Sequence, residues 1–207
     1  MVDIVRRWKR RTFQWLDRQL VYSRQHSWQA IVQSNAKLSA EASIENISGD
    51  ARQINIGANS FVRGRLLIYG HGGSIKLGEW CYIGVRSEIW SMESVTIGDR
   101  VLIAHDVNIN DGSAHSLDPM ERHLHYQKIR TVGHPRTWDE LPGIHAAPIV
   151  IEDDVWISFG VTILQGVTIG ARSIIAAGSL VTANVPPDSI YRCKIEPIIQ
   201  PIDIKNR

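Results

Sequence analysis

The sequence predicts an all-β protein built as a parallel β-helix, with a helical segment before it and one long loop extruded between its coils. Three observations predict this fold: an aliphatic residue at every sixth position from 151 to 181, earlier stretches with the same spacing, and one long interruption between them. A helix repeats near 3.6 residues and a strand near 2. A period of six therefore requires a short strand followed by a corner that turns the chain.

The repeat is clearest near the C-terminal end, where its anchors are Ile151, Ile157, Ile163, Ile169, Ile175 and Val181. The residue four positions after each anchor is small or β-branched, which suits a second inward contact between coils stacked about 4.8 Å apart. Earlier anchors with the same spacing are Ile56, Val62, Ile68, Leu77, Ile83, Ile89, Ile97, Ile103 and Ile109. Three units close one triangular coil, so about five coils are expected, with corner insertions at 69–74 and 90–94.

Residues 1–38 are predicted to form an N-terminal helical segment, because apolar residues recur there at helical spacing among arginines and lysines. The β-helix domain is predicted over residues 39–190 and a C-terminal tail over 191–207, with the two flanking segments capping the ends of the coil. A basic amphipathic helix of this kind packs on its own domain or on a partner subunit. Peripheral contact with a membrane surface is the alternative.

The composition excludes several classes of protein. A net charge of +2 over 207 residues does not favour binding to nucleic acid. Cys81 and Cys193 form no CxxC pair, which fits a reducing compartment. No apolar run approaches the roughly 18 residues of a membrane span, and no signal peptide is apparent. The sequence therefore predicts a cytoplasmic protein, with the inner face of the membrane as an alternative location.

The long interruption covers residues 110–148, far more than a corner needs. It is rich in His, Pro and Gly and contains five of the eight histidines: His115, His123, His125, His134 and His145. Long ordered loops on rigid scaffolds are common places for binding and catalytic residues. This loop is therefore the first place to look for a functional site.

Four segments, VTIGDRVLIAHDVNI, DGSAHSLDP, PIVIEDDVWISFGVTILQGVTIGARSIIAAGSLVT and VPPDSI, resemble the hexapeptide-repeat O-acetyltransferases. Within that family the resemblance is to galactoside, maltose and nodulation-factor acetyltransferases and to those of bacterial surface-polysaccharide clusters. It implies a left-handed coil, an exception to the usual hand of parallel crossovers. It also implies acetyl-CoA as the donor, no metal, a sugar or polysaccharide-precursor acceptor, and a homotrimer with active sites between subunits.

His115 in SAHSLDP matches the family's catalytic histidine. A sugar hydroxyl attacks poorly unless a base takes its proton, and histidine titrates in the useful range. The resemblance implies that His115 is the general base for direct transfer without an acyl-enzyme. Asp111 and Asp118 are candidates for orienting its imidazole or binding the acceptor, although short polar residues also favour turns. The other loop histidines and His105 are interpreted as surface residues.

Trp156 in DDVWI matches a tryptophan that in the family lines the active site across a subunit boundary, where an aromatic face suits a sugar ring or the pantetheine arm. By the same resemblance Gly160, Ala177 and Thr182 are candidates for contacting coenzyme A. Small residues at these positions are equally well explained by tight corners.

The sequence departs from the family in two places. Ala183 stands where a lysine is usual, and YRCKIEP replaces an AGNPA segment, so Arg192 and Lys194 are the candidates to bind the coenzyme phosphates. Arg86 in IGVRSEIW occupies about the place of an acceptor-binding asparagine. An arginine there favours an anionic acceptor, with an exposed ion pair as the alternative.

Three alternatives stay open on the sequence. The first is N-acetylation of an amino sugar, which uses similar chemistry. The second is a zinc lyase like the γ-class carbonic anhydrases, which needs three histidines on zinc, whereas the regular hexads offer no histidine pair at ligand spacing. The third is a non-catalytic trimeric scaffold that binds sugar.

Overall fold

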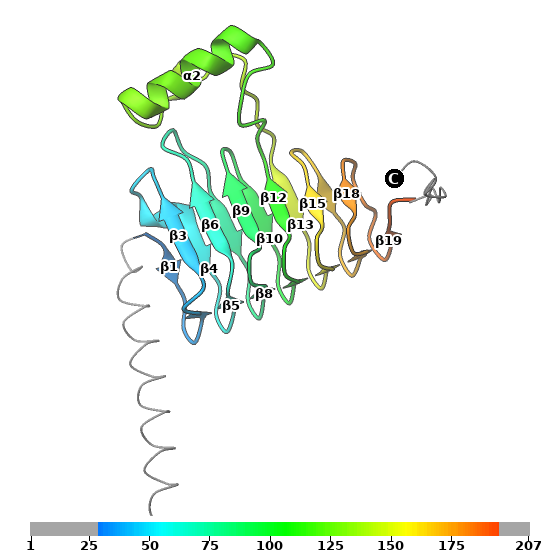
Figure 1. Cartoon of the computed structure of the whole chain (residues 1–207). Helices are drawn as coiled ribbons and strands as arrows, with labels where there is room; N and C mark the ends of the chain where they lie inside the picture. Colours follow the sequence, from blue (N-terminus) through cyan, green and yellow to red (C-terminus); the bar gives the residue numbers. More distant parts are fainter. Residues whose placement is uncertain (1–28, 195–207) are drawn as a thin grey trace, which may run out of the picture.

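A computed structural model describes residues 29–194, and the predicted helix over 1–28 and the chain beyond 194 lie outside the described residues. Within this range the chain winds through short strands that stack as three parallel sheets, giving the three-sided coil of Figure 1. One long loop, which contains the helix α2 (Pro119–Thr131), leaves the coil and lies above one of its edges. The predicted parallel β-helix with an extruded loop is confirmed.

Each sheet takes one strand from every coil. The first sheet contains β1 (Ile31–Val32), β4 (Ile54–Ile56), β7 (Ile75–Leu77), β10 (Val95–Ile97), β13 (Ile149–Ile151) and β16 (Thr168–Ile169). The second contains β2 (Lys37–Leu38), β5 (Phe61–Val62), β8 (Tyr82–Ile83), β11 (Leu102–Ile103), β14 (Trp156–Ile157), β17 (Ile174–Ile175) and β19 (Ile190–Tyr191). The third contains β3 (Ser43–Asn46), β6 (Arg65–Ile68), β9 (Glu88–Ser91), β12 (Asn108–Asn110), β15 (Thr162–Ile163) and β18 (Leu180–Val181). Two short 3-10 turns, η1 (Ala51–Gln53) and η2 (Trp138–Glu140), lie in connections.

The described residues form six complete coils, and β19 begins a seventh, so the expected number of about five was low. The additional coil is β1 to β3, which begins at residue 31, inside the segment predicted to be helical up to residue 38. Val32, Leu38 and Ile44 carry the same six-residue spacing, and Leu38 and Ile44 are buried. The polar residues around these anchors hid the spacing from the sequence analysis.

The aliphatic anchors form continuous ladders through the interior. In the second sheet Val62, Ile83, Ile103, Ile157 and Ile175 lie in register, one above another, and all are fully buried. The small or β-branched residues four positions after each C-terminal anchor are also buried, as predicted. Burial of this kind contributes roughly 1.5–3 kcal/mol per large aliphatic side chain.

One predicted anchor is displaced. In the third sheet Leu66, not Ile68, lies in register with Ile89, because only three residues separate the anchors Val62 and Leu66. Gly64 makes this short corner possible, since a Cβ there would come within 2.2 Å of the Ser87 carbonyl oxygen.

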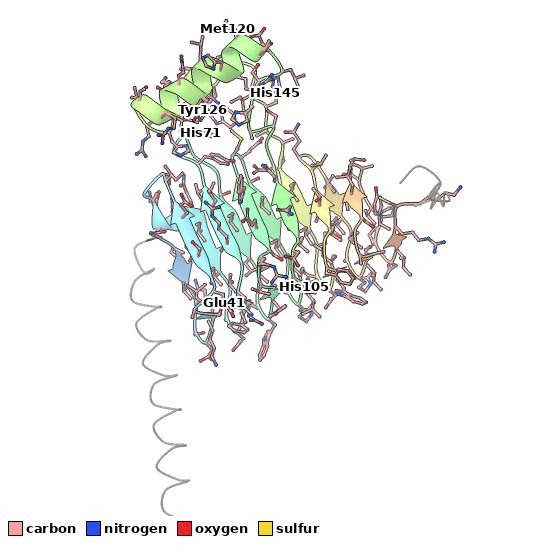
Figure 2. All side chains as sticks on the ribbon, in the orientation of Figure 1. Glu41, His71, His105, Met120, Tyr126 and His145 are labelled. Atoms are coloured by element: carbon pink, nitrogen blue, oxygen red, sulfur yellow. The ribbon has the colours of Figure 1, made fainter. Side chains whose placement is uncertain are left out.

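Two edges of the coil matter for function. We call the corner where third-sheet strands lead into first-sheet strands the loop edge, because the excursion between β12 and β13 leaves there. We call the corner where second-sheet strands lead into third-sheet strands the tail edge, because residues 192–194 follow β19 at that corner. In Figure 2 His71 and His145 mark the loop edge beside α2, and His105 marks the tail edge on the opposite side.

A matched pair of substitutions on β7 tests the inward ladder. Leu77→Ala removes a side chain that is 3% exposed and leaves a cavity, so the free energy of unfolding should fall by about 2–5 kcal/mol. Lys76→Ala, on the outer face of the same strand, should change it by less than about 0.5 kcal/mol. Denaturant unfolding of the two variants measures the difference, and equal losses would contradict the inward assignment of Leu77.

Candidate functional site

The excursion occupies the residues between Asn110, the last of β12, and Ile149, the first of β13, in agreement with the predicted loop 110–148. The sequence analysis did not predict the helix α2 inside it. Asp118 begins this helix as its N-cap, with one carboxylate oxygen accepting from the backbone N–H groups of Met120 and Glu121, each at 2.9 Å. Pro119 follows at the first helical position. The contacts of Asp118 are thus those of a capping residue.

Asp111 fastens the base of the loop. Its side chain is fully buried, and its carboxylate accepts from the Ser91 hydroxyl at 2.8 Å and from the backbone N–H groups of Met92 and Glu93 at 2.6 and 3.0 Å. Burial raises the pKa of this carboxyl, and the same donors oppose the rise. These contacts give Asp111 a structural role at the base of the loop, and its binding of an acceptor stays a prediction.

The loop packs onto the loop edge at several points. Met92 of the loop edge forms a small apolar cluster with Leu141 and Ile144 of the loop. The Arg136 guanidinium donates to the Ile47 carbonyl oxygen at 2.7 Å, which ties the far end of the loop to the first coil. A Cβ at residue 70 would meet the Pro135 carbonyl oxygen at 2.6 Å, so the close approach requires Gly70. The loop is therefore held both at its base and at its far end.

His115 lies near the start of the loop and lines a cavity of about 220 Å³ between the loop and the loop edge. Its backbone N–H donates to the Ser113 carbonyl oxygen at 2.6 Å, and Ala114 before it has a left-handed φ of +59°. The other walls are mainly aromatic, histidine and apolar side chains: Tyr69, His71, Trp90, Met92, His125, Ile129, His134, Pro135 and Leu141.

The histidines of this cavity influence one another. The rings of His115 and His125 lie edge to face with their centroids 5.5 Å apart. Burial lowers the pKa of His125, and the neighbouring His115, His134 and Lys128 lower it further. Burial and the neighbouring His125 likewise lower the pKa of His71. Both imidazoles are therefore mainly neutral at pH 7.

A second group of predicted residues lies at the tail edge. Gly160, Ala177, Arg192 and Lys194 follow the second-sheet strands β14, β17 and β19 and are all exposed. Arg86 follows β8 at the same edge, where its guanidinium forms a two-point ion pair with Asp106 at 2.6 Å for each bond. That contact is the exposed ion pair that the sequence left open, and it lies away from the cavity of His115.

Trp156 is on the outer face of β14 and is half exposed, and Thr182 follows β18 at the loop edge. Within one chain the fold therefore separates the predicted residues into two sets. His115, Asp111, Asp118 and Thr182 lie at the loop edge, whereas Trp156 and the remaining candidates lie on the second sheet or at the tail edge. The two sets can meet only between subunits.

His71 and Trp90 are not among the residues predicted for the site, and His125, interpreted as a surface residue, is partly buried, yet all three line the cavity. His134 lines it too and is exposed, as expected. A signal was present: the corner insertions at 69–74 and 90–94 and the long loop all interrupt the repeat at the loop edge. His105 is exposed, as expected, and its ring stacks on Phe159 with centroids 5.3 Å apart. Burial raises the pKa of the Cys81 thiol to about 11, so it is a poor nucleophile.

Residues 29–194 bear on two further questions, metal binding and membrane crossing. In this part of the chain no group of three or more His, Cys, Asp or Glu side chains is arranged to hold a metal ion. Nor does any helix in the described range have the length and apolar character needed to cross a membrane.

The repeat itself matches known families. Residues 148–183 match the family model for the bacterial transferase hexapeptide (six repeats), and residues 74–105 match the hexapeptide repeat of succinyl-transferase. These segments fall on the stacked coils on either side of the long loop. The chain is therefore a hexapeptide-repeat protein.

Two curated proteins of Escherichia coli K12 are similar to the chain. Galactoside O-acetyltransferase is 32% identical over 135 residues, which cover 65% of this chain and 57% of that enzyme. A protein named for O-acetyl transfer in lipopolysaccharide biosynthesis is 30% identical over 147 residues, covering 66% of each chain. The chain thus spans less than two thirds of the galactoside enzyme's length.

Among solved structures, the hexapeptide-repeat acetyltransferase VCA0836 of Vibrio cholerae superposes with a TM-score of 0.50 at 28% identity, covering 82% of this chain and 72% of that one. The fold is the left-handed parallel β-helix that the motifs predicted. The resemblance seen in the sequence is confirmed: the chain is related to the hexapeptide-repeat O-acetyltransferases.

The lowered pKa of His125 predicts a pH-dependent stability of the loop. An unfolded histidine, with a pKa of about 6.5, gains its proton more readily than the folded one, so the stability of the loop should fall as the pH falls from 7 to 5. Hydrogen exchange of the α2 amides, corrected for intrinsic rates, measures this loss.

His125→Phe should reduce the pH dependence, whereas His123→Phe, on an exposed position of the same helix, should leave it unchanged. An identical pH dependence in His125→Phe and the unaltered chain would contradict the assignment.

Proposed function

We propose that this protein transfers an acetyl group from acetyl-CoA to a hydroxyl group of a sugar or surface-polysaccharide precursor. The observation that carries the proposal is the position of His115. The motif-matched histidine lies on a cavity wall at the edge of a hexapeptide coil, in a loop that is fastened at its base and far end. The names of the two Escherichia coli relatives support O-acetyl transfer as the reaction.

In the proposed reaction an imidazole nitrogen of His115 takes the proton of the acceptor hydroxyl as its oxygen attacks the thioester carbonyl carbon. The new C–O bond gives a tetrahedral intermediate whose negative oxygen requires nearby hydrogen-bond donors. When the C–S bond breaks, the imidazolium returns its proton to the leaving thiolate. The products are the acetyl ester and free coenzyme A, and no acyl-enzyme forms.

The donor is proposed to lie along the tail edge of a neighbouring subunit. Gly160, Ala177, Arg192 and Lys194 are exposed there on successive coils, so small corner residues lie next to two cationic residues. Exposed backbone at such corners suits the amide groups of the pantetheine arm, and the cations suit its phosphates. Trp156, on the adjoining sheet, would close the site on the acyl side. Thr182 remains a proposed donor contact from the loop-edge side.

The assembly that brings both edges together is proposed to be a trimer. Its support is the outer face of the second sheet, where mainly aromatic and aliphatic side chains lie in register: Phe61, Tyr82, Leu102, Trp156, Ile174 and Ile190. Leu102 and Trp156 are 50% and 49% exposed in the single chain. At the same levels the outer positions of the third sheet are mainly polar, namely Arg65, Glu88, Asn108 and Thr162, with Leu180 as the exception. The second sheet is therefore the face that a neighbouring subunit would cover.

The acceptor class is proposed from the relatives' names, which include galactoside and lipopolysaccharide acetylation. Acetyl-CoA and the activated sugars from which such polymers are built are cytoplasmic metabolites, so the cytoplasm is the proposed compartment. Contact of residues 1–28 with the inner face of the membrane stays a proposal, since they lie outside the described structure.

His115→Ala tests the base directly. Thiol release from acetyl-CoA with a panel of sugars and nucleotide sugars should show kcat reduced by about 10²–10⁴ in this variant. His123→Ala, exposed on α2, should retain full activity. An unchanged kcat in His115→Ala would rule out the general base, and failure of the unaltered chain to bind acetyl-CoA would favour a scaffold instead.

Leu102→Glu tests the trimer. A carboxylate in the middle of the apolar column should lower the sedimentation coefficient to that of a single chain and abolish transfer, because His115 and Trp156 would no longer share a site. Lys76→Glu, exposed on the first sheet, should keep both the assembly and the activity. A monomer that remains fully active would show that the site is complete in one chain.

A further inference from the structure

The cavity beside His115 contains polar atoms that nothing in residues 29–194 satisfies. Three buried nitrogens have no hydrogen-bond partner: His71 Nε2, Trp90 Nε1 and His125 Nδ1. All three residues line this one cavity. A buried donor or acceptor left unpaired costs roughly 1–3 kcal/mol, so native structures rarely place three together without an occupant. Ordered water can satisfy these nitrogens in the free protein, and a ligand that brings oxygen atoms to this place can replace that water.

The walls limit the charge of that ligand. No Lys, Arg, Asp or Glu lines the cavity. Of the cations nearby, Lys128 pairs with Glu140 at 2.7 Å, Arg65 pairs with Glu45, and the Arg136 guanidinium donates to the Ile47 carbonyl oxygen at 2.7 Å. His71 and His125 are mainly neutral at pH 7 for the reasons given above. Moving a carboxylate into such surroundings costs far more than moving a hydroxyl group. The cavity therefore favours an uncharged ligand.

Size and chemistry limit it further. About 220 Å³ lies below the range of roughly 300–1,000 Å³ that drug-sized ligands occupy, so the space takes one ring rather than two. The indole N–H can only donate, whereas each imidazole donates or accepts according to its tautomer. A hydroxyl group can accept a hydrogen bond from the indole N–H and can donate to, or accept from, an imidazole. The wall also contains the aromatic side chains of Tyr69 and Trp90, a kind that packs on the apolar C–H face of a sugar ring, and the Arg65 guanidinium lies over the Trp90 ring, 5.4 Å from its centroid.

We propose that this cavity seats a single uncharged sugar ring of the acceptor, with Trp90, His71 and His125 hydrogen-bonding its oxygens beside His115. The proposal rests on the proposed function and deepens it by naming the acceptor's charge class and the residues that select it. The corner insertions at 69–74 and 90–94 and the long loop then have a common purpose, because together they build a pocket that a regular coil would lack. The acceptor hydroxyl reaches His115 from the ring that the pocket holds.

Binding of simple glycosides to the full chain tests the pocket without turnover. By calorimetry or saturation-transfer NMR, methyl β-galactoside or methyl β-glucoside should bind, and methyl β-glucuronide should bind at least tenfold more weakly. Trp90→Phe and His125→Phe each remove one hydrogen bond and should weaken binding of the neutral glycoside about tenfold. Trp80→Phe and His123→Phe, exposed residues away from the cavity, are the matched controls and should bind as the unaltered chain does.

The outcomes separate the pocket from the reaction. Neutral glycosides that bind through Trp90 and His125, while acetyl-CoA is never consumed, would uphold the pocket and overturn the transferase. Transfer to sugars that Trp90→Phe and His125→Phe leave unchanged would uphold the transferase and overturn the pocket. Tighter binding of the glucuronide, or no binding of any of the three glycosides, would also overturn it. His71 lies in a different corner of the coil. If Trp90→Phe or His125→Phe fails to fold, binding of the neutral glycoside to the His71→Phe variant tests the pocket in its place.

Discussion

Every other feature of this protein depends on the register of its inward aliphatic ladders. A residue such as Ile103 is buried only because Ile83 and Ile157 lie directly below and above it, and the parallel strands fix that alignment residue by residue. A one-residue shift within a strand would turn the aliphatic side chain outward. Extra residues are therefore tolerated only at corners, where they leave the ladder intact. The packing of the core therefore restricts insertions, and the functional residues that they carry, to the three edges of the coil.

The enlarged connections of the coil are concentrated at the loop edge. Four connections between the third and first sheets are longer than the regular corner, and the last of them carries α2. Asp111 connects the loop to the coil. Its buried carboxylate accepts hydrogen bonds from one hydroxyl and two backbone N–H groups of the corner at 91–93. Hydrogen bonds to a charged acceptor are stronger than neutral ones. The start of the loop, and with it His115, is therefore positioned by the coil.

The separation of the two sets of candidate residues has an equally simple cause. A triangular coil places successive strands on different faces, so residues in the β11–β12 corner and residues in the β12–β13 corner lie on different edges however close they are in sequence. His105 and His115 are only ten positions apart, yet His105 lies at the tail edge, away from α2 and the loop edge (Figure 2). A site that uses both edges would require a neighbouring coil, and the apolar outer column of the second sheet is the surface proposed for that contact.

The sequence alone determined the period of six, the buried anchors and the presence of a long loop, and it predicted His115 as the base, because each is a local pattern read along the chain. It did not reveal the first coil, whose anchors lie among polar residues, or the role of Asp111, which depends on a corner about twenty residues earlier. Only the tertiary structure brought His71, Trp90 and His125 to one cavity. Stacking of corners places residues from three different coils together, and no local pattern records which corner side chains then face one another.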